Sequence, residues 1–200
     1  MPSGTVERFR PTSGQLLGWT GLVLAAVAVV GGLVEGPSWS VVSGALAFAV
    51  LDWAALLKPR LIVSGRWLVL RNMLETIHLP LAAVEELAVR QVFAVRVGEK
   101  RYVSPAVGRS FRQTLKSNRR GASADTAAAK TGTDLADQAY ADFVEQRIRH
   151  LAAEARELES VGRYSAAQDA LAGEVRRVPA WLEIGLLVVT VAAFVVSLVV

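Results

Sequence analysis

The chain has 200 residues, of which 52% are hydrophobic, and its formal net charge is +4. It contains no cysteine, which excludes disulfides, thiol catalysis and zinc sites with cysteine ligands. The two histidines, His78 and His150, are far apart in sequence and lack the local spacing of a metal site. The apolar residues gather in three windows, and each is long enough to cross a hydrocarbon layer about 30 Å thick. We therefore expect an integral membrane protein.

Residues 1–14 form a short polar segment, and residues 15–57 are predicted to be a transmembrane hairpin. Its helices are Gln15–Val34 and Trp39–Leu57, joined by the turn Glu35–Ser38. A cleaved signal peptide is the alternative for the first helix, but the long apolar run and the second span close behind it favour a retained helix. Small residues recur along one side of the first helix, as close helix packing in lipid requires. They are Gly14, Gly18, Gly21, Ala25, Ala28 and Gly32.

Residues 179–200 are predicted to form a third transmembrane helix. Lys58 and Arg60 follow the second span, Arg176 and Arg177 precede the third, and the turn of the hairpin has neither lysine nor arginine. The positive-inside rule therefore places the N-terminus and the polar middle of the chain in the cytoplasm, and the turn and the C-terminus outside. We expect a multi-pass protein of the inner (plasma) membrane.

Residues 58–117 contain short strand-like runs separated by turn-like breaks at Ser64-Gly65 and Gly98–Lys100. Apolar residues alternate along these runs as in strands with one buried face. The side chains expected to face inward are Phe93, Val95, Val97, Leu68 and Leu70. About six short strands with tight connections predict an antiparallel meander that curls into a small barrel or sandwich. The expected fold class is therefore α+β, with membrane helices before and after the sheet region.

Helices are predicted again after the strands. Ser104-Pro105 has the residues of a helix start, and residues 118–133 form a linker rich in small and polar residues. Residues 134–178 are predicted to be cytoplasmic amphipathic helices. Within them, apolar residues recur at helical spacing over Asp134–Ser160, and a capping-box pattern at Ser165 opens a second, short helix.

Three runs of the strand region carry a family resemblance: Pro59–Val63, Leu68–Asn72 and Thr76–Glu85. They resemble bacterial pleckstrin-homology (PH)-like domains, especially the type that follows a transmembrane hairpin in actinobacterial membrane proteins of the low-molecular-weight antigen 6 kind. The similarity covers residues 40–104. It implies a PH-like barrel plugged at one end by a helix, and a role in binding or assembly rather than catalysis. Either Pro105–Ser117 or Asp134–Ser160 is the expected plugging helix.

The same resemblance argues against one ligand. Eukaryotic phosphoinositide-binding members carry a cluster of lysine and arginine around the first loop between strands. This chain has only Ser64-Gly65-Arg66 at that place, which is too short to form a headgroup cradle. We therefore do not expect high-affinity recognition of inositol phosphates.

A basic set of residues is the first candidate site. These side chains would be attracted to an anionic lipid surface, whereas the absence of aromatic interleaving or a DNA-binding motif argues against nucleic acid. A solvated helix face is the alternative. The set consists of Arg109, Arg112, Lys116, Arg119 and Arg120.

Two acidic residues within the spans, Asp52 and Glu183, are the second candidates, because ionisable groups at membrane depth are costly. Each lies close to the cytoplasmic end of its span and can reach the interface or pair with Lys58 or Arg177. We favour this structural role over an ion or proton path.

The chain has no nucleophile motif, phosphate-binding glycine loop or HExxH metal site. We therefore expect neither enzymatic activity nor a cofactor. The expected function is that of an adaptor or scaffold that displays a protein- or lipid-binding surface at the inner leaflet. It would associate with a protein partner or a second copy through its membrane helices. The alternative is an accessory subunit of a larger membrane transport or envelope-synthesis complex.

Overall fold

The computed structural model describes residues 6–10, 14–34, 38–108 and 132–199. The chain divides into two compact units. The first, here called the β-rich unit, consists of Met1–Ser13, Arg60–Leu70 and Ile77–Arg176. The second, here called the helical unit, consists of Gly14–Pro59, Arg71–Thr76 and Arg177–Val200.

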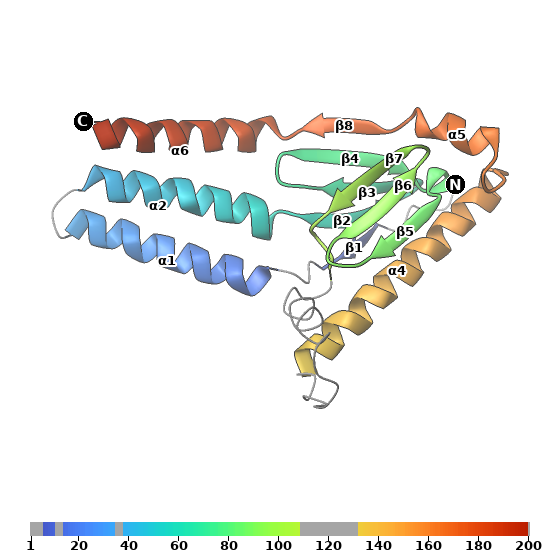
Figure 1. Cartoon of the computed structure of the whole chain (residues 1–200), viewed down its shortest axis with the longest axis horizontal. Helices are drawn as coiled ribbons and strands as arrows, with labels where there is room; N and C mark the ends of the chain where they lie inside the picture. The colour runs from blue at the N-terminus through green and yellow to red at the C-terminus, as the bar shows by residue number, and fades with distance from the viewer. Residues whose placement is uncertain (1–5, 11–13, 35–37, 109–131, 200) are drawn as a thin grey trace, which may run out of the picture. The chain divides into compact units, whose positions relative to one another are not determined.

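Among the described residues, the helical unit contains three helices that are long and apolar enough to cross a membrane. They are α1 (Gln15–Val34), α2 (Trp39–Asp52, continued by the π-helical turn Trp53–Leu57) and α6 (Trp181–Val199). Helix α2 packs against both α1 and α6 (Figure 1). These helices agree with the three predicted spans.

Small residues bring α1 and α2 together. The buried residues of α1 are Gly18, Gly21 and Ala25, all from the predicted small-residue side. A Cβ atom at Gly18 would lie 2.9 Å from the Leu57 side chain, so the two helices approach too closely there for a larger residue. The predicted packing face of the first span is therefore confirmed.

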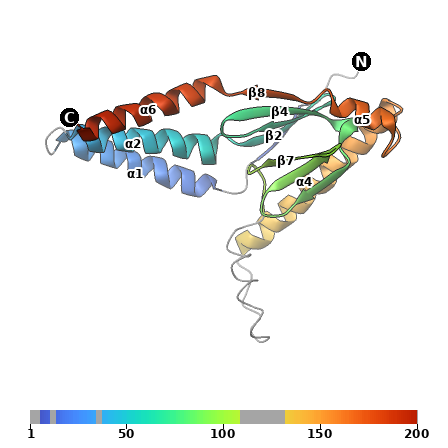
Figure 2. The same ribbon diagram turned by 45° about the horizontal axis from the view of Figure 1, so that its top comes forward.

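The described residues contain eight strands in two antiparallel sheets. One sheet has the order β1-β2-β3-β4-β8 and the other the order β5-β6-β7 (Figures 1 and 2). The strands are β1 (Glu7–Phe9), β2 (Arg60–Ser64), β3 (Trp67–Arg71), β4 (Glu75–Pro80), β5 (Glu86–Val89), β6 (Phe93–Val97), β7 (Lys100–Ser104) and β8 (Arg176–Pro179). The predicted α+β class is confirmed, but the described strands form no closed barrel. Strands β1 and β8 were not expected from the sequence.

The core of the β-rich unit is lined by the side chains that alternation predicts. Phe93, Leu68 and Leu70 are fully buried, and Val95 and Val97 are almost so. One departure is Ala94, which was expected to face outward and yet is only 6% exposed. It is a small residue in the central strand of its sheet, and the strands on both sides of it shield it from solvent.

Helix α4 (Gly132–Leu158) supplies one wall of this core. Its buried side chains recur every three or four residues, as one face of a helix requires. They are Ala141, Val144, Ile148, Ala152 and Ala155, and all belong to the core cluster. Of the two predicted plugging helices, the one at Asp134–Ser160 therefore packs on the sheets.

The predicted helix start at Ser104-Pro105 is wrong. Ser104 is the last residue of β7, where it pairs with Phe93, and Pro105 and Ala106 form a turn. The Ser104 hydroxyl accepts a bond of 3.4 Å from the Ala106 amide, so its local bond closes a turn instead of capping a helix. The rest of that predicted helix and the linker at residues 118–131 lie outside the described residues.

Helix α5 (Ala166–Ala172) begins where the capping-box pattern predicts. The Ser165 hydroxyl accepts from the Gln168 amide at 3.2 Å, which satisfies one of the free N–H groups of the first turn. The Gln168 side chain is buried and donates to the Ala82 carbonyl at 3.0 Å. The helix ends before Arg177, because the chain turns into β8.

Strand β1 is tied to α4 by an ion pair between Glu7 and Arg147, in which the Arg147 Nε donates to Glu7 Oε2 at 3.0 Å. This hydrogen bond holds the pKa of Glu7 below its ordinary value. A carboxyl group with a lowered pKa in the folded state stabilises the fold above its unfolded pKa of about 4.3 and loses this contribution as the pH falls.

We therefore expect the stability difference between the wild type and a Glu7→Gln variant to be constant near neutral pH. It should shrink as the pH falls below about 4.3 and through the lowered pKa of the folded state. Hydrogen exchange of the β1 and β2 amides, measured across this pH range, would follow the change. A difference that stays constant down to the most acidic pH would contradict the ion pair.

Candidate functional site

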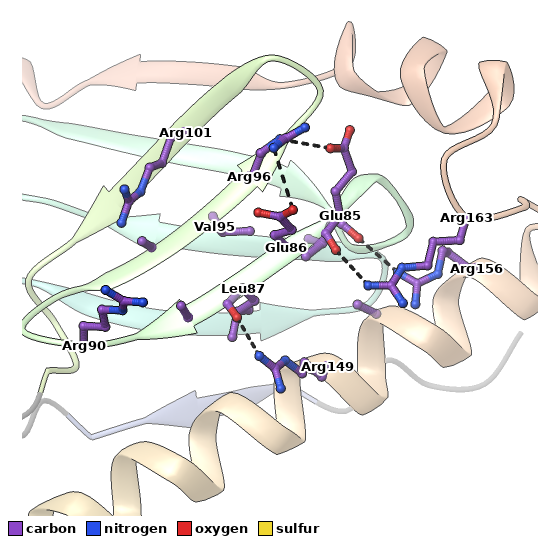
Figure 3. Close-up of a pocket in the computed structure, with 14 residues that line it drawn as sticks. Glu85, Glu86, Leu87, Arg90, Val95, Arg96, Arg101, Arg149, Arg156 and Arg163 are labelled. Atoms are coloured by element: carbon purple, nitrogen blue, oxygen red, sulfur yellow. Dashed lines mark hydrogen bonds and ion pairs between the residues drawn. The ribbon is translucent and has the colours of Figure 1, made fainter.

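The β-rich unit contains a groove of about 820 Å³ between the outer side of the sheet β5-β6-β7 and helix α4 (Figure 3). We call it the arginine groove, after the residues that dominate its lining. Among the described residues, its lining has two glutamates, Glu85 and Glu86, and six arginines: Arg90, Arg96, Arg101, Arg149, Arg156 and Arg163. Basic side chains thus outnumber acidic ones three to one among the charged lining residues.

The floor of the groove is made by small residues. Ala88 of β5 and Ala94 of β6 are paired across the strands, and both line the groove. Side chains on one face of a sheet stand close to their cross-strand partners, so two alanines opposite one another leave a hollow. The next partners along this face are charged, with Arg96 opposite Glu86 on one side and Arg101 on the other. Register therefore places charged side chains around an uncharged floor.

Helix α4 forms the wall and also covers the edge of the sheet. Strand β5 lies at one edge of its sheet and would otherwise present unpaired backbone groups. Arg149 donates to the Leu87 carbonyl at 2.9 Å, and the Glu145 carboxylate accepts from the Val89 amide at 2.9 Å. These side chains take the place of a neighbouring strand.

The residues just before β5 are covered in the same way. Arg156 donates to the Val84 carbonyl at 3.0 Å, and Arg163 donates to the Glu85 carbonyl at 3.4 Å. A peptide could add to this edge as a further strand only by displacing these bonds. Any ligand of the arginine groove would therefore contact side chains and not the backbone of β5.

The two glutamates are already engaged. Arg96 lies 3.2 Å from the Glu85 carboxylate and 3.7 Å from that of Glu86. The Gly98 amide also donates to Glu85 at 2.8 Å, which fixes the carboxylate at the turn between β6 and β7. Arg90 and Arg101 are different, because their exposed side chains make no hydrogen bond or ion pair with any residue that the structure describes.

Sequence reasoning did not identify this groove. One signal was present: Arg149 and Arg156 are seven residues apart on one helix, which places them on the same face two turns apart. The other members come from β5, β6 and β7, and only the strand register brings them together. The predicted lipid-contact set, Arg109, Arg112, Lys116, Arg119 and Arg120, lies outside the described residues and stays a prediction.

Glu183 was expected to reach the interface or to pair with Lys58 or Arg177, and in the structure it pairs with Lys58. Its carboxylate lies 2.6 Å from the Lys58 ammonium group, with the two side chains 18% and 12% exposed. Lys58 also donates to the Met73 carbonyl at 3.1 Å. The pair joins the start of α6 to the end of the hairpin within the helical unit.

Asp52, the other acidic residue of the spans, has different surroundings. It is 7% exposed and lies against α1, where a Cβ atom on Gly21 would come within 2.6 Å of its Oδ1. Its Oδ2 has no hydrogen-bond partner among the described residues. The π-helical turn begins at the next residue, Trp53, and such turns are frequent at functional sites. Asp52 therefore stays a candidate without an assigned role.

We expect Lys58→Met to destabilise the helical unit by about 1–3 kcal/mol, because it leaves the half-buried Glu183 carboxylate without its cation. The double variant Lys58→Met/Glu183→Leu removes both charges and should recover most of the loss. Thermal unfolding of the full-length protein in one detergent would compare the three proteins. A double variant that is no more stable than Lys58→Met would show that the pair does not act as a unit.

The remaining chemistry is limited. Within the described ranges, no three His, Asp or Glu side chains gather as a metal site would require. No protein-family model matches the chain, and comparison with curated proteins and with solved structures found no significant match. The arginine groove is therefore the feature from which a function can be argued.

Proposed function

We propose that this protein is a non-enzymatic membrane adaptor whose β-rich unit binds an anionic ligand in the arginine groove. The observation that carries the proposal is the pair of exposed arginines, Arg90 and Arg101, which have no partner among the described residues and stand beside a hollow floored by alanines. A guanidinium group presents a planar fork of donors that matches carboxylates and phosphates. Arginines needed only for stability would be expected to carry a bond, as Arg149 and Arg156 do.

Membrane anchoring gives this binding a location. The three apolar helices support a multi-pass protein of the inner membrane, and the positive-inside rule puts the β-rich unit in the cytoplasm. The basic residues between 109 and 120 would add contact with anionic lipid of the inner leaflet. Two antiparallel sheets around one core, with a helix packed on them, support the PH-like assignment as part of the proposal. An actinobacterial origin is part of the same proposal.

The topology has a direct test. Reporters that are active only after export are expected to work when fused at position 37 or after Val200, since both places lack flanking lysine and arginine. A reporter that is active only in the cytoplasm should work when fused at the N-terminus. Strong cytoplasmic activity at position 37 or after Val200 would reverse the orientation.

The alternative function is an accessory subunit of a larger membrane complex. Two observations favour it: the Oδ2 of Asp52 is buried with no hydrogen-bond partner among the residues that the structure describes, and α6 has no buried residue of its own over Trp181–Val199. Both would be explained by contact with helices of another protein. In that case a multi-span protein should co-purify, whatever the state of the arginine groove.

The adaptor proposal is tested by comparing two proteins purified from native membranes, the wild type and Arg90→Gln/Arg101→Gln. Mass spectrometry of bound lipids, small molecules and proteins should find an anionic species that the double variant loses. Arg60→Gln is the matched control, because Arg60 is exposed on β2, outside the groove. If the same species are bound to the wild type, to Arg90→Gln/Arg101→Gln and to Arg60→Gln, the groove is rejected as the binding surface.

A further inference from the structure

We infer that the ligand of the arginine groove is a compact polyanion that carries two phosphate groups, such as a diphosphate. This inference rests on the proposed function and adds the chemical class of the ligand. It is carried by the charge of the groove, by the distribution of its arginines and by the closed edge of β5.

Charge comes first. Among the described residues, the six arginines less the two glutamates leave four positive charges on the lining, and the Glu145 carboxylate, 2.6 Å from Arg149, balances one of them, so three remain. A phosphate monoester carries about −1.5 to −2 at pH 7, so two phosphate groups balance the lining and one does not. Carboxylates carry one charge each, so a small acid would need three of them. Two phosphates are the smallest common group that matches the lining.

The arginines are spread over both sides of the groove. In the view of Figure 3, Arg90 and Arg101 lie on one side and Arg156 and Arg163 on the other, with Arg149 between them on α4. Each guanidinium group has five N–H donors. The bond from Arg156 to the Val84 carbonyl uses one of these, so the α4 side retains donors for a ligand although its arginines also cover the strand edge. A ligand with two anionic groups, one on each side of the groove, could accept hydrogen bonds from the arginines of both sides.

An extended acidic peptide fits less well. Peptides that bind beside a sheet gain most of their affinity by pairing with an edge strand, and side chains of α4 already occupy the edge of β5. The volume of about 820 Å³ lies within the range of about 300–1,000 Å³ that is usual for small-molecule sites. A compact ligand can lie wholly inside such a groove, whereas a peptide would extend beyond it at both ends.

The two phosphates could belong to a soluble compound or to the headgroup of a membrane lipid, since the chemistry is the same. Two probes distinguish these sources. Inorganic diphosphate reports the soluble form, and farnesyl diphosphate held in a neutral phosphatidylcholine bilayer reports the lipid form. Binding of both with equal affinity would assign recognition to the phosphates alone, and tighter binding of the second would assign it to a lipid.

The experiment uses the full-length protein in phosphatidylcholine nanodiscs and titration calorimetry at one fixed salt concentration. Inorganic diphosphate should bind at least tenfold more tightly than inorganic monophosphate. Arg90→Gln and Arg101→Gln should each weaken diphosphate binding about tenfold, since a hydrogen bond to a charged group is lost. Arg60→Gln should bind as the wild type does.

A variant that keeps all six arginines tests the hollow itself. Ala88→Leu places a larger side chain on the floor beside Ala94 and should abolish diphosphate binding. Ala88 is half-buried on the outer face of β5, so the core residues Leu87 and Val89 are left unchanged. Hydrogen exchange of the β5 amides would establish that each variant remains folded. If Ala88→Leu unfolds, the effects of Arg90→Gln and Arg101→Gln on diphosphate binding still test the inference, because both side chains are exposed.

Three results would overturn the inference: equal affinity for monophosphate and diphosphate, no effect of the Arg90 and Arg101 variants, or tighter binding of an oligoglutamate peptide than of diphosphate. The failure of the inference is distinct from that of the proposed function. If the native anionic species is lost from Arg90→Gln/Arg101→Gln while diphosphate does not bind, the function stands and the ligand class is wrong. If the double variant keeps every bound anionic species and diphosphate does not bind, the proposed function and the inference are both wrong.

Discussion

Replacement of Phe93 by alanine is expected to lower the stability of the β-rich unit by about 3–5 kcal/mol. Phe93 is the first residue of β6, the central strand of its sheet, and its side chain is 0% exposed. Its removal takes away the burial of a ring and leaves a cavity that the two sheets can close only in part. Because small domains are stable by only about 5–15 kcal/mol, the loss would be a large fraction of the total.

Hydrogen exchange of the full-length protein in nanodiscs would measure this effect without separating the two units. Amides of β2, β3 and β6 that exchange by global opening should lose protection by about 100-fold to several thousand-fold, at tenfold for each 1.4 kcal/mol. Val92→Ala is the control, since Val92 is the exposed neighbour of Phe93. A loss of protection in Phe93→Ala no greater than in Val92→Ala would place the ring outside the core.

The core strands could be predicted from the sequence because each carries its own signal. Alternation marked Phe93, Val95 and Val97, and a turn at Gly98 with φ of +57° closed the hairpin to β7. Strands β1 and β8 carry no such signal. They have three and four residues, too few for a period to be recognised, and they are strands because β2 and β4 offer them partners.

The arginine groove could not be predicted for a related reason. Its floor depends on Ala88 standing opposite Ala94, which is a matter of register between strands and not of either run alone. From the sequence alone, Arg149 and Arg156 would be interpreted as part of a solvated helix face. Only the structure shows that they bind backbone carbonyls of β5 and of the residues just before it. A sequence pattern reports which face of a helix is charged but not what that face will meet.

Helix α4 joins the stability of the β-rich unit to its proposed binding. One face buries Val144 and Ile148 in the core, and the adjacent side chains Glu145 and Arg149 bind the backbone of β5. The groove exists only while this helix is docked. Any change that loosens α4 should therefore affect the edge of β5 and ligand binding together.

Ile148→Ala is expected to show this coupling. The Ile148 side chain is fully buried near the middle of α4, and its truncation should cost about 2–5 kcal/mol. Weaker docking of α4 removes the Glu145 carboxylate from the Val89 amide, so that amide should exchange faster by a larger factor than amides of β3. Diphosphate binding, measured as above, should weaken in the same variant because Arg149 and Arg156 leave the wall of the groove.

The matched control is His150→Ala, on the exposed side of the same helix. Alanine is a better helix former than histidine, so this variant should keep or slightly raise the stability of α4. Its Val89 amide and its affinity for diphosphate should equal those of the wild type. If Ile148→Ala left the exchange of the Val89 amide unchanged while the α4 amides lost protection, the helix would unfold independently of the sheet. The arginine groove would then have to keep its shape without α4. The hydrogen bonds from Arg149 to the Leu87 carbonyl and from Arg156 to the Val84 carbonyl argue against this.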